Sequence, residues 1–169
     1  TTWWRSSPPS TGCRSMRALV QRVSEASVAV GGEVVGQCGR GLVVLLGVGP
    51  NDDETSCRRL WDKVRDLRVF DDADGRMNLA LGAVGGGVLV VSQFTLYADC
   101  RRGLRPSFTG AANPQLGRRL YDRFCALAER DVGHVGRGVF GADMQVSLVN
   151  DGPVTIWLDT DELSRRGVG

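Results

Sequence analysis

Histidine and lysine are almost missing from this sequence of 169 residues. His134 is the only histidine, which excludes a metal site built from several histidines and leaves one residue for any Ser-His-Asp triad. Lys63 is the only lysine, so arginine carries nearly all the positive charge. Arginine suits phosphate contacts. A GC-rich genome produces the same preference for arginine over lysine. The net charge of +2 is too small to predict nucleic-acid binding.

The few cysteines form no recognisable set. They are odd in number, widely spaced and without a CxxC pair, which argues against a disulfide framework or a zinc knuckle. This usage favours a reducing compartment, and we expect the protein in the cytoplasm. The cysteines are Cys13, Cys38, Cys57, Cys100 and Cys125.

Long hydrophobic runs are also missing. No run of about eighteen apolar residues exists, so we expect no contact with a membrane through a spanning segment. Thr1–Ser15 lack the apolar centre of a signal peptide and contain no acid, which also fits a short organelle-targeting segment. We favour a disordered extension or an upstream start, because Met16 opens a strand-like run. We expect a single domain over 16–160 and a flexible tail over 161–169.

Strand signals dominate this domain. Gly31-Gly32 between two apolar runs is typical of a two-residue hairpin, and residues 41–48 and 88–91 are continuously apolar, as in strands buried on both faces. The predicted strands cover residues 18–23, 27–30, 33–35, 41–48, 88–91, 135–140, 144–149 and 154–158.

Two segments have the apolar spacing of helices. The first follows the cap candidates Asn51–Glu54, and the second starts at Asn113-Pro114, a cap followed by proline at the first helical position. The order of elements predicts an α/β fold in which a curved, barrel-like sheet is flanked by two main helices. The apolar stripes are Leu60, Trp61, Val64 and Leu67, and Leu116, Leu120, Phe124 and Leu127.

Two motifs that would bind a cofactor or metal are incomplete. Asp71–Gly75 lacks the ligand pattern of a calcium loop and is interpreted as an acidic turn. Gly85–Gly87 lack the lysine and the spacing of a phosphate-binding loop. We therefore expect no cofactor and no metal.

The first candidate site is the segment Ser92-Gln93-Phe94-Thr95, where a buried strand suddenly carries polar side chains. Sheets of α/β proteins commonly bind ligands at such strand ends. The same side chains could instead only satisfy backbone groups where the strand stops. Spacing alone leaves both interpretations open.

The second candidate is Asn150–Thr155, which lies between two predicted strands and contains Gly152-Pro153. A glycine followed by proline between strands is typical of a tight turn, and X-Pro bonds are where a cis peptide is cheap. A cis bond would present two neighbouring carbonyls as a rigid gate. A third stretch, Cys100–Phe108, combines Arg102 and Arg105 with turn residues, as in either a phosphate-binding loop or a solvated basic loop.

Four segments together closely resemble the D-aminoacyl-tRNA deacylase family. The match runs in order over Met16–Asp159, so the ordered set is specific although each short motif is weak. The segments are MRALVQRV from Met16, SQFTLYAD from Ser92, RPSF from Arg105, and FGADMQVSLVNDGPVT from Phe140.

This resemblance implies a homodimer with the deacylase-like fold and an active site at the subunit interface. The expected activity is hydrolysis of the ester between a D-amino acid and the 3′-terminal adenosine of tRNA, with glycyl-tRNA for alanine as a second substrate. Gly152-Pro153, followed by Thr155, would reach into the partner's pocket and reject L-amino acids through main-chain carbonyls. No DNA is expected as a partner.

The resemblance also implies roles for Ser92, Gln93, Phe94 and Thr95 as catalytic residues. Backbone N–H groups near Gln93 and Phe94 would stabilise the oxyanion, which fixed donors do most effectively. Thr95 is expected to be a pocket residue rather than a nucleophile, because no base is visible near it and the 2′-OH of the adenosine can assist.

Two other functions compete with this one. A general esterase would use Ser92 or Thr95 with His134, and a non-catalytic module would bind tRNA or a partner without cleaving the ester. Neither His134 nor Cys100 occupies a position that we can match to a motif.

Overall fold

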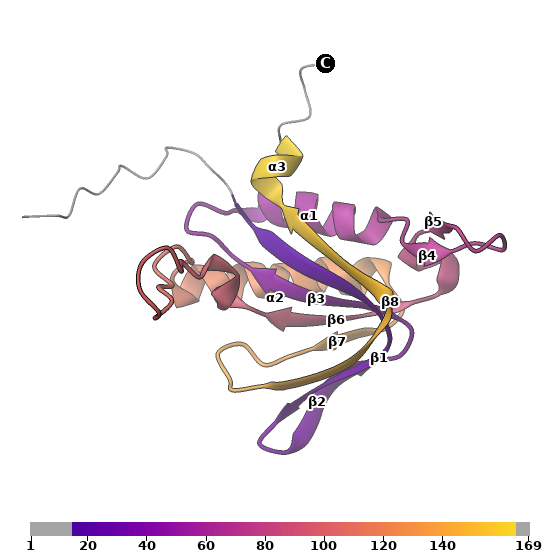
Figure 1. Cartoon of the computed structure of the whole chain (residues 1–169), viewed down its shortest axis with the longest axis horizontal. Coiled ribbons are helices and arrows are strands. Elements are labelled where there is room, and N and C mark those ends of the chain that lie inside the picture. The colour runs from indigo at the N-terminus through magenta and orange to yellow at the C-terminus, as the bar shows by residue number, and fades with distance from the viewer. Residues whose placement is uncertain (1–14, 165–169) are drawn as a thin grey trace, which may run out of the picture.

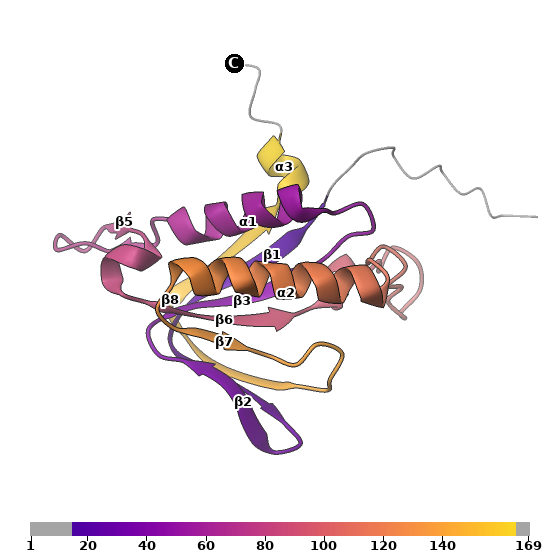
Figure 2. The same ribbon diagram turned by 180° about the vertical axis from the view of Figure 1, so that it is seen from behind.

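A strongly curved six-stranded sheet forms the centre of the computed structural model, which describes residues 15–164 (Figure 1). The strand order is β2-β1-β3-β6-β7, and β8 pairs with the other edge of β1. Two long helices cover one face of the sheet, as Figure 2 shows from behind. The strands are β1 (Arg17–Val30), β2 (Glu33–Cys38), β3 (Gly41–Gly47), β6 (Gly87–Ser92), β7 (Val135–Arg137) and β8 (Gln145–Asp159), and the helices are α1 (Glu54–Asp66) and α2 (Pro114–Asp131).

Smaller elements connect these. They are β4 (Phe70–Asp71), β5 (Met77–Leu79), the 3₁₀ turns η1 (Leu81–Val84) and η2 (Phe94–Tyr97), and α3 (Thr160–Ser164). The predicted acidic turn is confirmed between β4 and β5. Helix α3 corrects the expected tail, since residues 160–164 are helical and Thr160 exchanges hydrogen bonds with the Met16 backbone. The expectations for residues 1–14 and 165–169 lie outside the described residues.

Strand β1 is one long strand where the sequence predicted two. Its first half pairs with β3, its second half pairs with β2, and β8 runs along the opposite edge. The predicted hairpin at Gly31-Gly32 is confirmed, and both glycines have positive φ. A strand shared among three neighbours must bend, which brings β2 round towards β7 and nearly closes the barrel.

The barrel closes where two glycines let β2 and β7 approach each other. A Cβ added at Gly136 would lie 2.6 Å from the Gln37 carbonyl oxygen, and one at Gly36 would meet the Arg137 backbone. Side chains at these positions would hold the two strands apart, because backbone atoms cannot give way as a flexible side chain can.

Two apolar clusters fill the faces of the sheet. The larger lies between the sheet and the helices, where Trp61 of α1 meets Phe124 of α2 edge-on at 5.5 Å between ring centroids. The smaller lies inside the curve and includes Val43 and Leu89. Strands β3 and β6 contribute to both clusters, which confirms the prediction that they are buried on both faces.

Side-chain caps fix where each helix begins. Asp53 accepts a hydrogen bond from the Ser56 backbone N–H at 3.0 Å at the start of α1. Asn113 accepts from the Leu116 N–H at 2.9 Å before Pro114 starts α2, as predicted. None of the helices within residues 15–164 is long and apolar enough to span a membrane.

The close approach of β2 and β7 makes Gly136 intolerant of a side chain. We expect Gly136→Ala to lower the free energy of unfolding by about 1–3 kcal/mol, as overpacking does elsewhere. Gly133→Ala is the matched control, because a Cβ there meets nothing within 4 Å. Urea denaturation of both variants measures the difference, and equal stabilities would contradict the packing argument.

Candidate functional site

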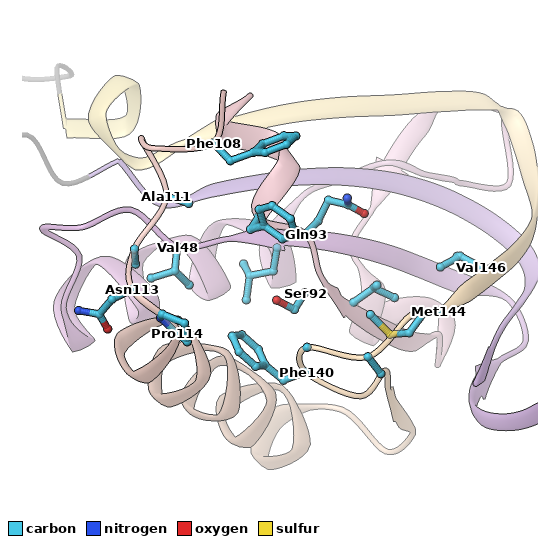
Figure 3. A pocket seen from close by; sticks show the side chains of 17 residues that line it. Val48, Ser92, Gln93, Phe108, Ala111, Asn113, Pro114, Phe140, Met144 and Val146 are labelled. Atoms are coloured by element: carbon cyan, nitrogen blue, oxygen red, sulfur yellow. The ribbon is translucent and has the colours of Figure 1, made fainter. Parts of the chain in front are cut away.

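A cavity of about 580 Å³ opens where β3 and β6 end, beside the first turns of α2 (Figure 3). One side carries the polar segment that follows β6, and the remaining walls are mainly apolar. The lining residues are Leu46, Val48, Val91, Ser92, Gln93, Phe94, Phe108, Ala111, Ala112, Asn113, Pro114, Gly117, Phe140, Gly141, Ala142, Met144 and Val146. The predicted ligand site at the end of this strand therefore coincides with a cavity.

The backbone turns sharply where β6 enters the 3₁₀ turn η2. The Gln93 N–H donates to the Leu46 carbonyl at 2.8 Å, and the Leu96 N–H donates back to the Gln93 carbonyl at 3.3 Å. Phe94 and Thr95 are the first residues of η2, so their N–H groups have no acceptor within the turn. Neither N–H finds an acceptor elsewhere within residues 15–164. Two unused donors thus lie next to each other at the start of η2, and the first of them belongs to the lining residue Phe94.

The side chains of the segment separate into two groups. Ser92, Gln93 and Phe94 line the cavity, whereas Thr95 does not. The Gln93 side-chain amide donates a short hydrogen bond to the Thr95 hydroxyl. An amide donor is not a base, so nothing in the described chain would activate Thr95 as a nucleophile.

Aromatic rings form two opposite walls of the cavity. Phe94 and Phe108 meet edge-on at 5.1 Å between centroids on the side of the loop after η2. Phe140 lies on the side of α2, and Figure 3 shows it pointing inward. Gly117 leaves room for the Phe140 ring, because a Cβ there would approach the ring to 3.2 Å.

Gly152-Pro153 lies elsewhere, on a bulge of β8. Register passes from Gln21 opposite Thr155 to Val23 opposite Asn150, so the four residues 151–154 stand opposite the single residue Arg22. The predicted tight turn between two strands is wrong, because β8 continues in one direction through the bulge and remains paired with β1 on both sides of it. The Gly152-Pro153 peptide bond is cis, and both residues are exposed.

Arg22 fixes the backbone of the bulge by a hydrogen bond to Asp151. The sequence patterns did not identify this residue. The residue is 8% exposed, and its side chain donates to the Asp151 carbonyl at 2.9 Å and the Val69 carbonyl at 2.7 Å. It also lies 3.4 Å from the Asp71 carboxylate. An arginine at the next inward position after Ala18 and Val20 in the strand alternation was the available signal, since a buried guanidinium requires such partners.

Thr155 takes part in the hydrogen bonds beside the bulge. Its hydroxyl accepts from the Asn150 side-chain amide at 3.0 Å, and the Asn150 side-chain carbonyl oxygen accepts from the Val154 N–H at 2.8 Å. Neither Gly152-Pro153 nor Thr155 lines the cavity of its own chain. One chain therefore does not bring the two predicted segments together.

A cluster around Arg17 supports η2 through contacts with Leu96 and Tyr97. Arg17 donates to the Leu96 carbonyl at 2.9 Å, pairs with Asp159 at 3.2 Å and lies over the Tyr97 ring at 4.6 Å. The Tyr97 hydroxyl donates a short hydrogen bond to the Ser15 carbonyl. Strand β1, strand β8 and η2 are thereby joined at one point.

Asp52 is a buried carboxyl near this cluster. One oxygen accepts from the Gly49 N–H at 2.6 Å, while Oδ1 has no partner, and the residue is 5% exposed. Burial raises the pKa of Asp52 to about 6, against the opposing hydrogen bond from Gly49. The loop that it fixes leads from Val48, a lining residue, to α1.

His134 belongs to a different place in the fold. Its Nε2 lies 2.7 Å from the Gln37 carbonyl, in a second cavity of about 710 Å³ that also includes Cys38 and Ser147. The triad of a general esterase with Ser92 or Thr95 is therefore not assembled. Burial raises the pKa of the Cys38 thiol to about 11, which keeps it protonated at neutral pH.

The remaining predicted residues lie on the surface. Arg102 and Arg105 are exposed in the loop between η2 and α2, and Cys100 is an exposed free thiol before them. The part of the chain that the structure describes contains no group of three or more residues suited to a metal ion.

A family model, curated relatives and a solved structure are similar to this chain. A family model described as D-Tyr-tRNA(Tyr) deacylase matches residues 19–159. A D-aminoacyl-tRNA deacylase of Lacticaseibacillus casei is 59% identical over 146 residues, covering 86% of this chain and 99% of the relative. One of Thermotoga petrophila is 57% identical over 148 residues, covering 88% and 99%. The solved structure of a c-Myc DNA Unwinding Element Binding Protein is 38% identical, with a TM-score of 0.79 over 84% of this chain and 97% of that one.

The buried carboxyl should make stability depend on pH. The folded-state pKa of Asp52, about 6, lies above its usual 3.8, so the folded state binds more protons between these values and stability falls as pH rises through them. Between pH 4 and 7 we expect the wild type to lose about 1–3 kcal/mol relative to Asp52→Asn, which stays neutral.

Urea denaturation at several pH values measures this difference. Asp74→Asn in the exposed acidic turn controls for the loss of one charge. Parallel profiles of the wild type and Asp52→Asn would show that the buried carboxyl does not titrate in this range.

Proposed function

We infer the function of this chain from its family: it belongs to the D-Tyr-tRNA(Tyr) deacylase family, and we propose that it is a hydrolase that cleaves the ester of D-aminoacyl-tRNA. The products would be the free D-amino acid and tRNA with an intact 3′-terminal adenosine. The observation that carries the proposal is the cavity at the end of β6, whose polar side is formed by the SQF part of the family-like segment. We place this proofreading of translation in the cytoplasm, where tRNAs are charged.

The unused amides at the start of η2 are the proposed oxyanion donors. The Gln93 N–H is occupied by Leu46, so the N–H groups of Phe94 and Thr95 are assigned this role. They are fixed by the turn and need no reorganisation when charge develops on the ester oxygen. Ser92 and Gln93 would shape the adjoining surface of the pocket.

Gly152-Pro153 is proposed as a gate that a second copy of the chain supplies. The bulge exposes it away from the cavity of its own chain, and Arg22 fixes the carbonyl that precedes it. Its carbonyls would exclude an L side chain, whereas a D-amino acid or glycine would be admitted, so glycyl-tRNA for alanine is a second proposed substrate.

A homodimer would place this gate against the partner's cavity. Several large apolar side chains on the sheet and beside the cavity are exposed, which is typical of a protein interface. They include Phe94 at 57%, Val149 at 50% and Trp157 at 43%.

Arg102 and Arg105 are proposed to contact the tRNA backbone beyond the terminal nucleotide. Both lie on the exposed loop that carries Phe108 to the cavity. They would add affinity without base specificity, because phosphate contacts carry no sequence information.

A module that binds nucleic acid without cleaving it is the competing function. The solved structure at 38% identity is that of a protein named for binding a DNA element. We favour the hydrolase, because a binding module has no need of two adjacent unused amides beside a cavity. Release of the amino acid from charged tRNA distinguishes the two functions.

Chirality is the first property to test. We expect the purified protein to hydrolyse D-Tyr-tRNA faster than L-Tyr-tRNA by on the order of a hundredfold or more, since the wrong enantiomer meets fixed backbone. Release of labelled tyrosine measures both rates, and light scattering gives the oligomeric state. Equal rates would contradict the gate, and an active monomer would contradict its donation by a partner.

Which group activates the attacking water is a separate question. If the 2′-OH of the terminal adenosine assists, a 2′-deoxy substrate should react at least about 10²-fold more slowly, in the range of general acid–base effects. Thr95→Ala should retain most of the activity, because its hydroxyl has no base.

His134→Ala is the control for the esterase alternative and should leave the rate unchanged. Loss of turnover in either alanine variant, with normal cleavage of the deoxy substrate, would favour a side-chain nucleophile instead.

A further inference from the structure

Arg118 projects from the exposed side of α2 beside the wall of the cavity. Its guanidinium carbon lies 5.1 Å from the centroid of the Phe140 ring, and Phe140 lines the cavity. The ring in turn rests against Gly117, the residue before Arg118. The cation is thus held at the rim of the site by a side chain that belongs to the site.

No carboxylate pairs with this guanidinium. Asp122, one turn further along α2, is directed to Arg137 at 3.8 Å, and the described residues include no ion pair of Arg118. By contrast, Arg101 pairs with Asp99 at 2.7 Å. An exposed, unpaired arginine that packs on an aromatic face keeps its N–H edge available to an incoming anion.

The two ends of the cavity indicate which anion this is. The unused amides of Phe94 and Thr95 mark where the ester would react, and the Phe140 side lies across the cavity from Phe108 (Figure 3). When the ester lies near η2, the 5′ side of its nucleoside can extend across the cavity to the Phe140 rim. The group attached there in a nucleic acid is a phosphodiester, which a guanidinium binds through charge-assisted hydrogen bonds.

We propose that Arg118 binds the phosphodiester on the 5′ side of the terminal adenosine. This inference rests on the proposed function and extends it, since it identifies the feature that separates a polynucleotide ester from a simple nucleoside ester. Arg102 and Arg105 lie on the opposite, Phe108 side and would act further along the tRNA. Of these three arginines, only Arg118 is packed on a ring that lines the cavity.

Minimal substrates isolate this one phosphate. D-tyrosyl esters of adenosine and of cytidylyl-(3′,5′)-adenosine differ in whether a phosphodiester precedes the terminal nucleoside. For the wild type we expect kcat/KM to be about tenfold higher with the dinucleotide, as one charge-assisted contact allows. In Arg118→Gln this ratio should fall to near one, with the change in KM rather than kcat.

Arg119→Gln is the matched control, because it removes the same charge one residue further along the helix, at an exposed position that does not line the cavity. It should keep the wild-type ratio. A ratio that falls equally in both variants would replace the specific contact with a general field effect, and a ratio unchanged in Arg118→Gln would overturn the proposal. Thermal unfolding of both variants checks that the exposed substitutions leave the fold intact.

A binding measurement separates this proposal from the proposed reaction. A fluorescent CCA trinucleotide with a non-hydrolysable D-tyrosyl amide should bind more weakly to Arg118→Gln, and the slope of log Kd against log salt should fall by about 0.7. If the wild type hydrolyses no ester but Arg118-dependent binding persists, the hydrolase assignment fails and the phosphate site stands. Identical salt slopes in the wild type and Arg118→Gln would rule out the phosphate contact.

Discussion

Strand β1 pairs with three other strands, and the shape of the molecule depends on this shared pairing. Its two halves face β3 and β2 in turn, while β8 follows its other edge. The sheet therefore bends until Gly36 and Gly136 let β2 and β7 meet. The same bend puts one apolar cluster under the helices and another inside the curve. The ends of β3 and β6, where the cavity opens, are thus fixed by strands that contribute little to its lining.

The cavity and the bulge of β8 have complementary properties. The cavity has apolar walls and lies beside two fixed N–H donors, but neither Gly152 nor Pro153 of its own chain lines it. The bulge offers exposed backbone that Arg22 fixes by hydrogen bonds, and Gly152 and Pro153 do not line this cavity. Such a division is expected when the site is completed by a second copy, and it explains why a rigid, buried guanidinium is needed where the strand is otherwise exposed.

Local patterns predicted most of the elements. Glycine-bounded apolar runs located β3 and β6, and the cap residues Asp53 and Asn113 located the two helices. Local patterns failed where the pairing between distant strands decides the secondary structure. Residues 144–149 and 154–158 were predicted as two strands separated by a turn, but β1 continues past the bulge and keeps them in one strand. A turn and a bulge can have the same local composition, since glycine and proline fit both places where regular strand pairing is interrupted.

The sequence by itself identified the polar segment after residues 88–91, the Gly152-Pro153 pair and the family, because these depend on residue order. Only the tertiary structure showed that Thr95 lies outside the cavity, that His134 belongs to a different one, and that Gln93 has already used its N–H. Only the tertiary structure showed that Arg22 bonds to the backbone of the bulge and that Arg118 packs on the Phe140 ring. Which groups are left without a partner depends on contacts between residues far apart in the chain, and local spacing does not encode these.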